Sequence, residues 1–168
     1  MSILVRYPEI ATVRFDPRGR CLKFTLIIRK HAGKPEKERS FKELLDAFEK
    51  KLRESLSSYQ SLIDIEPSQF EVDKTEAGNF CLITIRRDVM TLTHDEISLI
   101  IDLANEVLAG NLVVDHEAAL MEEERMAQDE MIANMLDDLR ESREGAKLIG
   151  FREEGRVVIF NKLAQGRR

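Results

Sequence analysis

The 168-residue chain has no tryptophan, only two cysteines, four prolines and eight glycines. Two cysteines are too few for a small secreted domain held together by disulfides. Collagen-like and low-complexity classes are excluded because they need much more proline and glycine. Long apolar runs are also absent, since the most apolar stretch, residues 97–114, contains Asp102, Asn105 and Glu106. We therefore predict that no segment spans a membrane.

The first residues lack the apolar stretch of a secretory signal peptide, so we expect a cytoplasmic protein. Apolar residues make up 43% of the chain and charged residues 34%, which is typical of a globular domain with a hydrophobic core. Cys21 and Cys81 have no CxxC spacing that would favour a redox pair or a thiolate metal site. We expect both to be reduced, buried and small apolar side chains.

Alternating apolar and polar residues predict three β-hairpins with a glycine in each turn. Their strands are residues 10–15 with 21–29, 69–75 with 80–87, and 148–151 with 157–160. For the first turn, after Asp16, we expect a three-residue loop that ends in a left-handed Gly19.

Helical spacing of apolar residues predicts three helices. Two of them begin at a capping box, Ser40 with Glu43 and Thr93 with Glu96, in which each side chain caps a backbone N–H at the helix start. A third and longer helix is predicted over 116–144, after Asp115, because this segment has no proline or glycine before Gly145.

The order of these elements is ββα-ββα-α-ββ, which predicts an α+β fold: an antiparallel sheet built from hairpins, with helices packed on one of its faces. We expect residues 1–112 to form the core domain. Residues 113–168, the long third helix and the C-terminal hairpin, would form an arm. The arm either folds back on its own chain or exchanges with a second subunit.

Charge is distributed unevenly along the chain. Residues 1–60 contain 14 basic and 8 acidic side chains, residues 61–145 contain 6 and 21, and residues 146–168 contain 6 and 2. A formal net charge of −5 argues against a general polyanion-binding protein. The favoured interpretation is that the basic and acidic regions lie against each other, within the fold or between subunits.

One hypothesis is nevertheless a nucleic-acid or phosphate-binding face on the first hairpin, because lysine and arginine on a sheet neutralise phosphates. Exposed aromatic residues for base stacking are not evident there, since Phe15 and Phe24 belong to the apolar side of their strands. The candidate residues are Arg14, Arg18, Arg20, Lys23, Arg29 and Lys30.

Methionines and aliphatic residues on the third helix form a candidate surface for oligomerisation or for a protein partner, because methionine adapts to irregular partners. Packing on the chain's own sheet is the alternative. The candidate residues are Met126, Met131, Ile132, Met135, Leu136 and Leu139.

No catalytic or cofactor motif is present: GxSxG, the P-loop, GxGxxG and HExxH are all missing. His94 and His116 stand beside acidic residues at predicted helix starts, where carboxylates are favoured for electrostatic reasons alone. We therefore predict no catalytic residue, no cofactor and no metal. An enzyme with a dispersed site, metal-assisted around one of these histidines, is kept as a third hypothesis.

The leading interpretation is a non-catalytic cytoplasmic protein that acts as a homo-oligomeric regulator or adaptor, with a dimer favoured and an unknown protein as partner. Nucleic-acid binding through the first hairpin is the second hypothesis. We expect no membrane partner.

Overall fold

The computed structural model describes residues 2–31, 35–116, 120–142 and 146–163. Its strands are β1 (Ile10–Asp16), β2 (Cys21–Arg29), β3 (Phe70–Ala77), β4 (Phe80–Asp88), β5 (Ala146–Glu153) and β6 (Arg156–Leu163). Its helices are α1 (Ser2–Arg6), α2 (Pro35–Leu62), α3 (His94–Leu108) and α4 (Glu122–Glu141).

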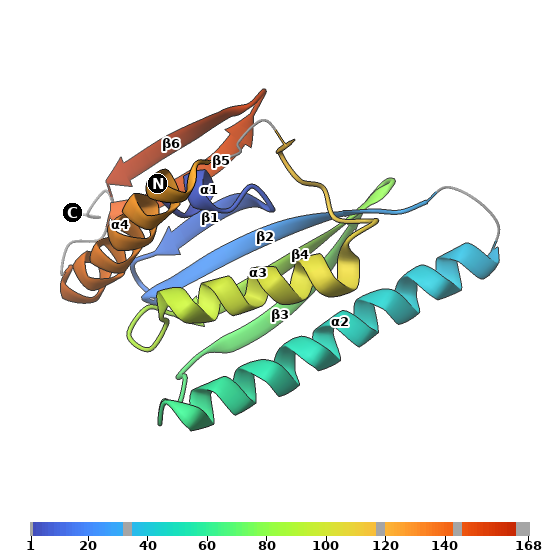
Figure 1. Cartoon of the computed structure of the whole chain (residues 1–168), viewed down its shortest axis with the longest axis horizontal. Helices are drawn as coiled ribbons and strands as arrows, with labels where there is room; N and C mark the ends of the chain where they lie inside the picture. Colours follow the sequence, from blue (N-terminus) through green and yellow to red (C-terminus); the bar gives the residue numbers. More distant parts are fainter. Residues whose placement is uncertain (1, 32–34, 117–119, 143–145, 164–168) are drawn as a thin grey trace, which may run out of the picture.

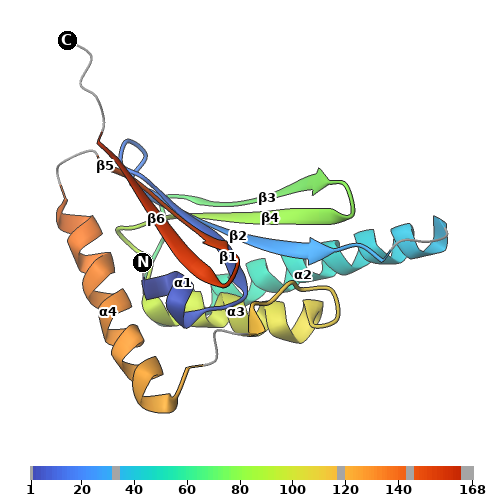
Figure 2. The ribbon, with the colours of Figure 1, turned by 90° about the horizontal axis from the view of Figure 1, so that it is seen from above.

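The six strands form one antiparallel sheet in the order β3-β4-β2-β1-β5-β6 (Figure 1). All four helices lie on one side of this sheet, as Figure 2 shows. The predicted α+β architecture with helices on one sheet face is therefore confirmed. We call the covered side of the sheet the helical face and the other side the open face.

The first hairpin differs from the prediction in its turn. Asp16 pairs with Cys21, so the loop has four residues, and its left-handed residue is Arg20, with φ of 49°, rather than Gly19. Gly19 has a different role: a Cβ there would lie 3.0 Å from Nη2 of Arg86, closer than side chains normally approach. The glycine lets the arginine of β4 reach the turn.

The second helix begins at Pro35, five residues before the predicted capping box at Ser40. Proline suits the first helical turn because its φ is already helical and its missing N–H is not needed there. Glu36 and Glu38 add favourable negative charge in the same turn. With 28 residues, α2 is about 42 Å long and is the longest helix of the described chain.

The predicted start of α3 is confirmed, because the Thr93 hydroxyl accepts a 3.2 Å hydrogen bond from the Glu96 N–H. Glu96 does not return the capping bond and instead binds Arg87 in the interior. The third predicted helix is wrong in extent: α4 covers 122–141 rather than 116–144. Residues 117–119 and 143–145 lie outside the described part of the chain. The short helix α1 was not predicted.

The C-terminal segment folds back on its own chain in this structure. Ile132 and Leu136 of α4 are buried in the main hydrophobic core, where α4 contacts α1 and α3. Strand β5 pairs with β1, with Phe15 opposite Leu148. The strands of this hairpin are longer than predicted, because pairing continues to the two-residue turn at Glu154–Gly155.

Candidate nucleic-acid interface on the open sheet face

Strand β2 shows how the sequence assigns side chains to the two faces. Leu22, Phe24, Leu26 and Ile28 are buried under the helices, because alternate residues of a strand point to the same side. The residues between them therefore belong to the open face, where no helix of the described chain covers them.

The strand registers align these open-face residues in rows across the sheet. One row runs across all six strands, from a carboxylate on β3 through three cations to apolar residues on β5 and β6: Glu71, Arg86, Lys23, Arg14, Ile149 and Phe160. The next row is neutral in its centre: Asp73, Thr84, Thr25, Thr12, Phe151 and Val158.

The three cations lie next to one another on the central strands. Lys23 stands directly opposite both Arg86 and Arg14 in the two strand pairs, so the cross-strand neighbours carry like charge. Arg86 makes a 3.5 Å ion pair with Glu71. Arg14 and Lys23 make no ion pair with any described residue. Two positive charges in the middle of the sheet are therefore left without an acidic partner.

Aromatic residues border these cations on the C-terminal hairpin. The rings of Phe151 and Phe160 stack with centroids 5.6 Å apart and planes 17° from parallel. Phe160 is 57% exposed. Arg29, the last residue of β2, lies over the ring of Phe80, 5.8 Å from its centroid. The open face thus combines cations with aromatic rings.

These aromatic residues and Arg86 were missed in the sequence analysis. The predicted C-terminal strands began at residue 148 and ended at 160, and their pairing partner was unknown. The alternation of Ile149 and Phe151 in β5 was the available signal, but only the pairing of β5 with β1 brings it beside Arg14.

The six basic candidates occupy three places. Arg14 and Lys23 lie in the centre of the open face, and Arg18 and Arg20 lie in the first turn, where Arg20 donates to the Arg140 carbonyl of α4. Arg29 and Lys30 lie at the far end of β2, where Arg29 is about 20 Å from Lys23 at 3.4 Å per residue. Lys30 is paired with Glu76 at 3.1 Å.

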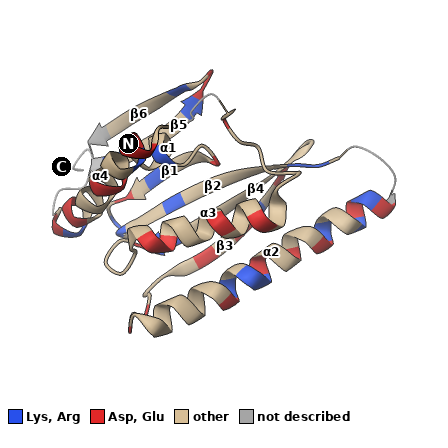
Figure 3. Cartoon of the chain, in the orientation of Figure 1, with Lys and Arg blue, Asp and Glu red and all other residues tan. Residues whose placement is uncertain are grey.

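Many acidic residues of the chain lie away from these cations, on the helices. Figure 3 shows them along α3 and α4, on the covered side of the sheet. Glu71 and Asp73 of β3 nevertheless belong to the open-face rows, so the segregation of charge along the sequence is only partly a segregation in space. The cations of the central strands face away from the acidic helices.

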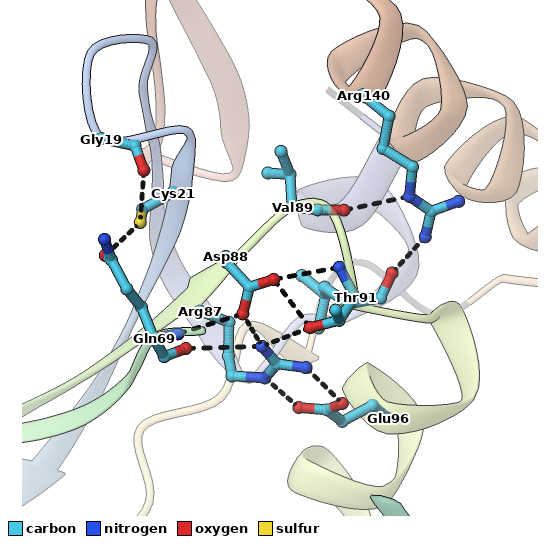
Figure 4. Close-up of polar contacts among 10 residues, drawn as sticks. Gly19, Cys21, Gln69, Arg87, Asp88, Val89, Thr91, Glu96 and Arg140 are labelled. Atoms are coloured by element: carbon cyan, nitrogen blue, oxygen red, sulfur yellow. Dashed lines mark hydrogen bonds and ion pairs between the residues drawn. The ribbon is translucent and has the colours of Figure 1, made fainter. Parts of the chain in front are cut away.

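A buried polar network holds the strand that carries Arg86 (Figure 4). The next side chain, Arg87, is fully buried on the helical face, where its Nη2 donates to Glu96 at 2.9 Å and its Nη1 donates to Thr91 at 3.1 Å. Burial opposes its charge, but Glu96 and Asp88 raise the pKa of Arg87 above its ordinary value. This network joins β4 to the start of α3.

The network also reaches the first turn and α4. The Cys21 thiol donates to the Gln69 side chain and to the Gly19 carbonyl, and Arg140 donates to the carbonyls of Val89 and Leu92. Both cysteines are reduced and buried. Burial raises the pKa of Cys81, which keeps it a neutral thiol.

A second polar cluster surrounds His94. Its Nε2 lies 2.7 Å from the Tyr7 hydroxyl, which in turn lies 2.5 Å from the Ser98 hydroxyl. Asp129 pairs with Arg6 at 2.7 Å and lies 3.3 Å from His94. The histidine therefore contacts a tyrosine rather than the serine, and this arrangement does not activate a serine nucleophile. The cluster ties α1 and α3 to α4.

The metal-assisted version of the enzyme hypothesis finds no ligand set. Within the described ranges, no three side chains of histidine, cysteine, aspartate or glutamate come close enough to hold a metal ion. His116 is exposed, and the residues that follow it lie outside those ranges.

The candidate surface on α4 is divided by the fold. Ile132 and Leu136 are buried in the chain's own core, and Met135 and Leu139 pack partly against it. Met126 and Met131 are 66% and 52% exposed. Only these two of the six candidates are freely available to a partner in this conformation.

No protein-family model, curated protein or solved structure gives a significant match to this chain. Among the described residues, no helix is both long and apolar enough to cross a membrane.

Proposed function

We propose that this protein binds single-stranded nucleic acid across the open face of its sheet and acts in the cytoplasm. The observation that carries the proposal is that Arg14 and Lys23, which have no acidic partner among the described residues, share the open face with the stacked rings of Phe151 and Phe160 on the adjoining strands β5 and β6. Single strands are held by this combination, because cations neutralise phosphates while aromatic rings stack on exposed bases.

The size and the setting of the face support a short single strand. From β4 to β6 the row crosses four strand spacings, about 19 Å. The acidic helices lie on the opposite side of the sheet, so a phosphate backbone is repelled there and attracted to the open face. This gives a protein of net charge −5 one surface on which a polyanion can bind.

The test is fluorescence anisotropy with labelled single-stranded RNA and DNA of about 12 nucleotides. We expect binding to both, and we expect affinity to fall steeply between about 50 and 200 mM salt. The double variant Arg14→Glu/Lys23→Glu should lose measurable binding. The variant Phe151→Ala/Phe160→Ala should bind at least tenfold more weakly, with an unchanged salt dependence.

The matched control is Lys42→Glu/Lys50→Glu, in which two exposed lysines of α2, on the helical side, undergo the same total change of charge. It should bind as the wild type does. Binding that is absent at low salt, or that is equal in the control and in both double variants, would show that the open face does not bind nucleic acid.

A second proposal is that the chain is a non-catalytic adaptor that presents the outer side of α4 to a protein partner. The exposed Met126 and Met131 favour it, because methionine side chains adapt to irregular partner surfaces. The variant Met126→Lys/Met131→Lys should abolish co-purification of that partner while leaving nucleic-acid affinity unchanged. If the partner still co-purifies, it does not bind at these methionines.

A further inference from the structure

The two edges of the sheet are built differently. The β3 edge carries four charged side chains among its eight residues, Glu71, Asp73, Lys74 and Glu76. Charges on an edge strand prevent pairing with another chain. The β6 edge instead has four consecutive apolar residues in its middle, Val157 to Phe160, without proline or an inward charge. The β3 edge is therefore protected against pairing with another chain, whereas the β6 edge lacks this protection.

The geometry of the last turn shows which backbone groups of β6 are unpaired. Glu154 and Gly155 both have positive φ, 46° and 73°, and join the pair Glu153–Arg156 in a two-residue turn. The closing pair of such a turn exchanges hydrogen bonds, and the pattern alternates along the strands. The N–H and C=O groups of Val157, Ile159 and Asn161 therefore point away from β5. No described strand pairs with this side of β6.

Apolar side chains flank this row of unpaired groups on both faces of the sheet. Ile159 belongs to the helical face and is 46% exposed, and Phe160 belongs to the open face and is 57% exposed. A strand that pairs here would satisfy the backbone groups and also cover apolar side chains above and below the sheet.

We propose that a second copy of this chain pairs antiparallel with β6 about a two-fold axis, so that the two sheets become one. With Val158 on the axis, Val157 faces the partner's Ile159, and Arg156 faces the partner's Phe160 in a cation–π arrangement. Both contacts occur twice by symmetry. The register with Ile159 on the axis places Val157 opposite the partner's Asn161 and lacks this complementarity.

The second copy fits better than an unrelated strand, because its own β6 supplies equal length together with matching apolar and basic positions. The pairing also keeps the open faces of both copies on the same side. The proposal does not rest on nucleic-acid binding: Phe160 belongs to both surfaces, but the backbone pairing uses the outer edge of β6 and not the cations.

Light scattering after size exclusion tests the association on protein shown by its absorbance ratio to be free of nucleic acid. We expect twice the chain mass of 19.4 kDa for the wild type. Ile159→Lys should give a monomer, because it adds an edge charge that two copies would bring together. Ile63→Lys is the matched control, since Ile63 is 37% exposed and lies outside the sheet; it should remain a dimer. Circular dichroism checks that both variants are folded.

Disulfide trapping tests the register. In the proposed pairing the two copies of position 158 face each other at about 4.5 Å between Cα atoms, within reach of a disulfide. Val158→Cys should therefore become a covalent dimer under mild oxidation. Phe160→Cys should not, because its two copies lie about 14 Å apart. The native cysteines are buried and do not compete.

The outcomes separate clearly. A wild-type monomer at high concentration, or a dimer that persists in Ile159→Lys, overturns the proposal. Trapping at position 160 without trapping at 158 also overturns it, because the copies then pair in a different register. Loss of the dimer with retained nucleic-acid binding would confirm the edge contact and leave the open-face proposal intact.

Discussion

Arg87 donates to both carboxylate oxygens of Glu96, and both side chains are completely excluded from solvent. The pair connects the end of β4 to the first turn of α3. Removing one partner of a buried ion pair is costly because the other charge stays buried without compensation.

Glu96→Gln should therefore lower the free energy of unfolding by about 3–5 kcal/mol. Glu106→Gln is the control on the same helix, because its ion pair with Lys51 is exposed; its effect should be below about 1 kcal/mol. Urea denaturation measures both. If the two variants are equally stable, the buried pair does not anchor α3.

Asp88 makes the stability of the protein depend on pH. Burial opposes its charge, but hydrogen bonds from Thr91 and the charge of Arg87 hold the pKa of Asp88 below its ordinary value. The folded state thus binds this proton more weakly than the unfolded state. The resulting stabilisation is complete above the ordinary pKa of about 3.9 and is lost as the pH falls through the lower, folded value.

Asp88→Asn should accordingly be less stable than the wild type at neutral pH, with the difference shrinking as the pH falls below about 4. Thermal unfolding across that range measures it. A stability difference that stays constant with pH would mean that the charge of Asp88 is not what stabilises the fold.

Tyr7 should ionise only at unusually high pH. Its burial raises the pKa of the hydroxyl above the ordinary value of about 10, and this effect exceeds the opposing hydrogen bond with Ser98. The chain has two tyrosines, so Tyr59→Phe leaves Tyr7 as the single phenol. Ultraviolet titration of that variant should show a midpoint above 10. A midpoint at or below 10 would indicate that the Tyr7 ring is open to solvent.

The contact between α4 and the core can be measured by paired truncations. Ile132→Ala removes a fully buried side chain and should cost about 2–5 kcal/mol of stability. Met126→Ala, on the same helix but 66% exposed, should cost less than about 1 kcal/mol. Chemical denaturation distinguishes them. Similar losses in the two variants would contradict the folded-back position of α4.

Local sequence signals predict the helices and strands of this fold much better than they predict the residues at which these elements begin and end. The period-two alternation identifies five of the six strands well, and the Thr93 cap places α3. The capping pattern at Ser40 is misleading, because proline and two glutamates upstream form an equally good helix start. The capping role predicted for Glu96 is wrong for another reason. Its side chain binds Arg87 in the buried interior, and a local motif does not reveal which residues are buried together.

The sequence alone predicts only part of the candidate site. Arg14 and Lys23 can be assigned to one strand face by alternation alone. Phe151 and Phe160 join them through pairing between opposite ends of the chain, and such long-range pairing leaves no local pattern. The division of the α4 candidates into buried and exposed residues likewise depends on where α4 docks.

The pairing of β1 with β5 also constrains the order of folding. Thr12 and Phe151, partners in the sheet, are 139 residues apart along the chain. During synthesis, β1 to β4 can assemble with α2 and α3 well before β5 exists, so β1 is a temporary edge. Closing so long a loop is slow, and the C-terminal hairpin is expected to dock last. Until it does, the growing chain exposes one edge of β1, the strand that carries Arg14, to any competing strand.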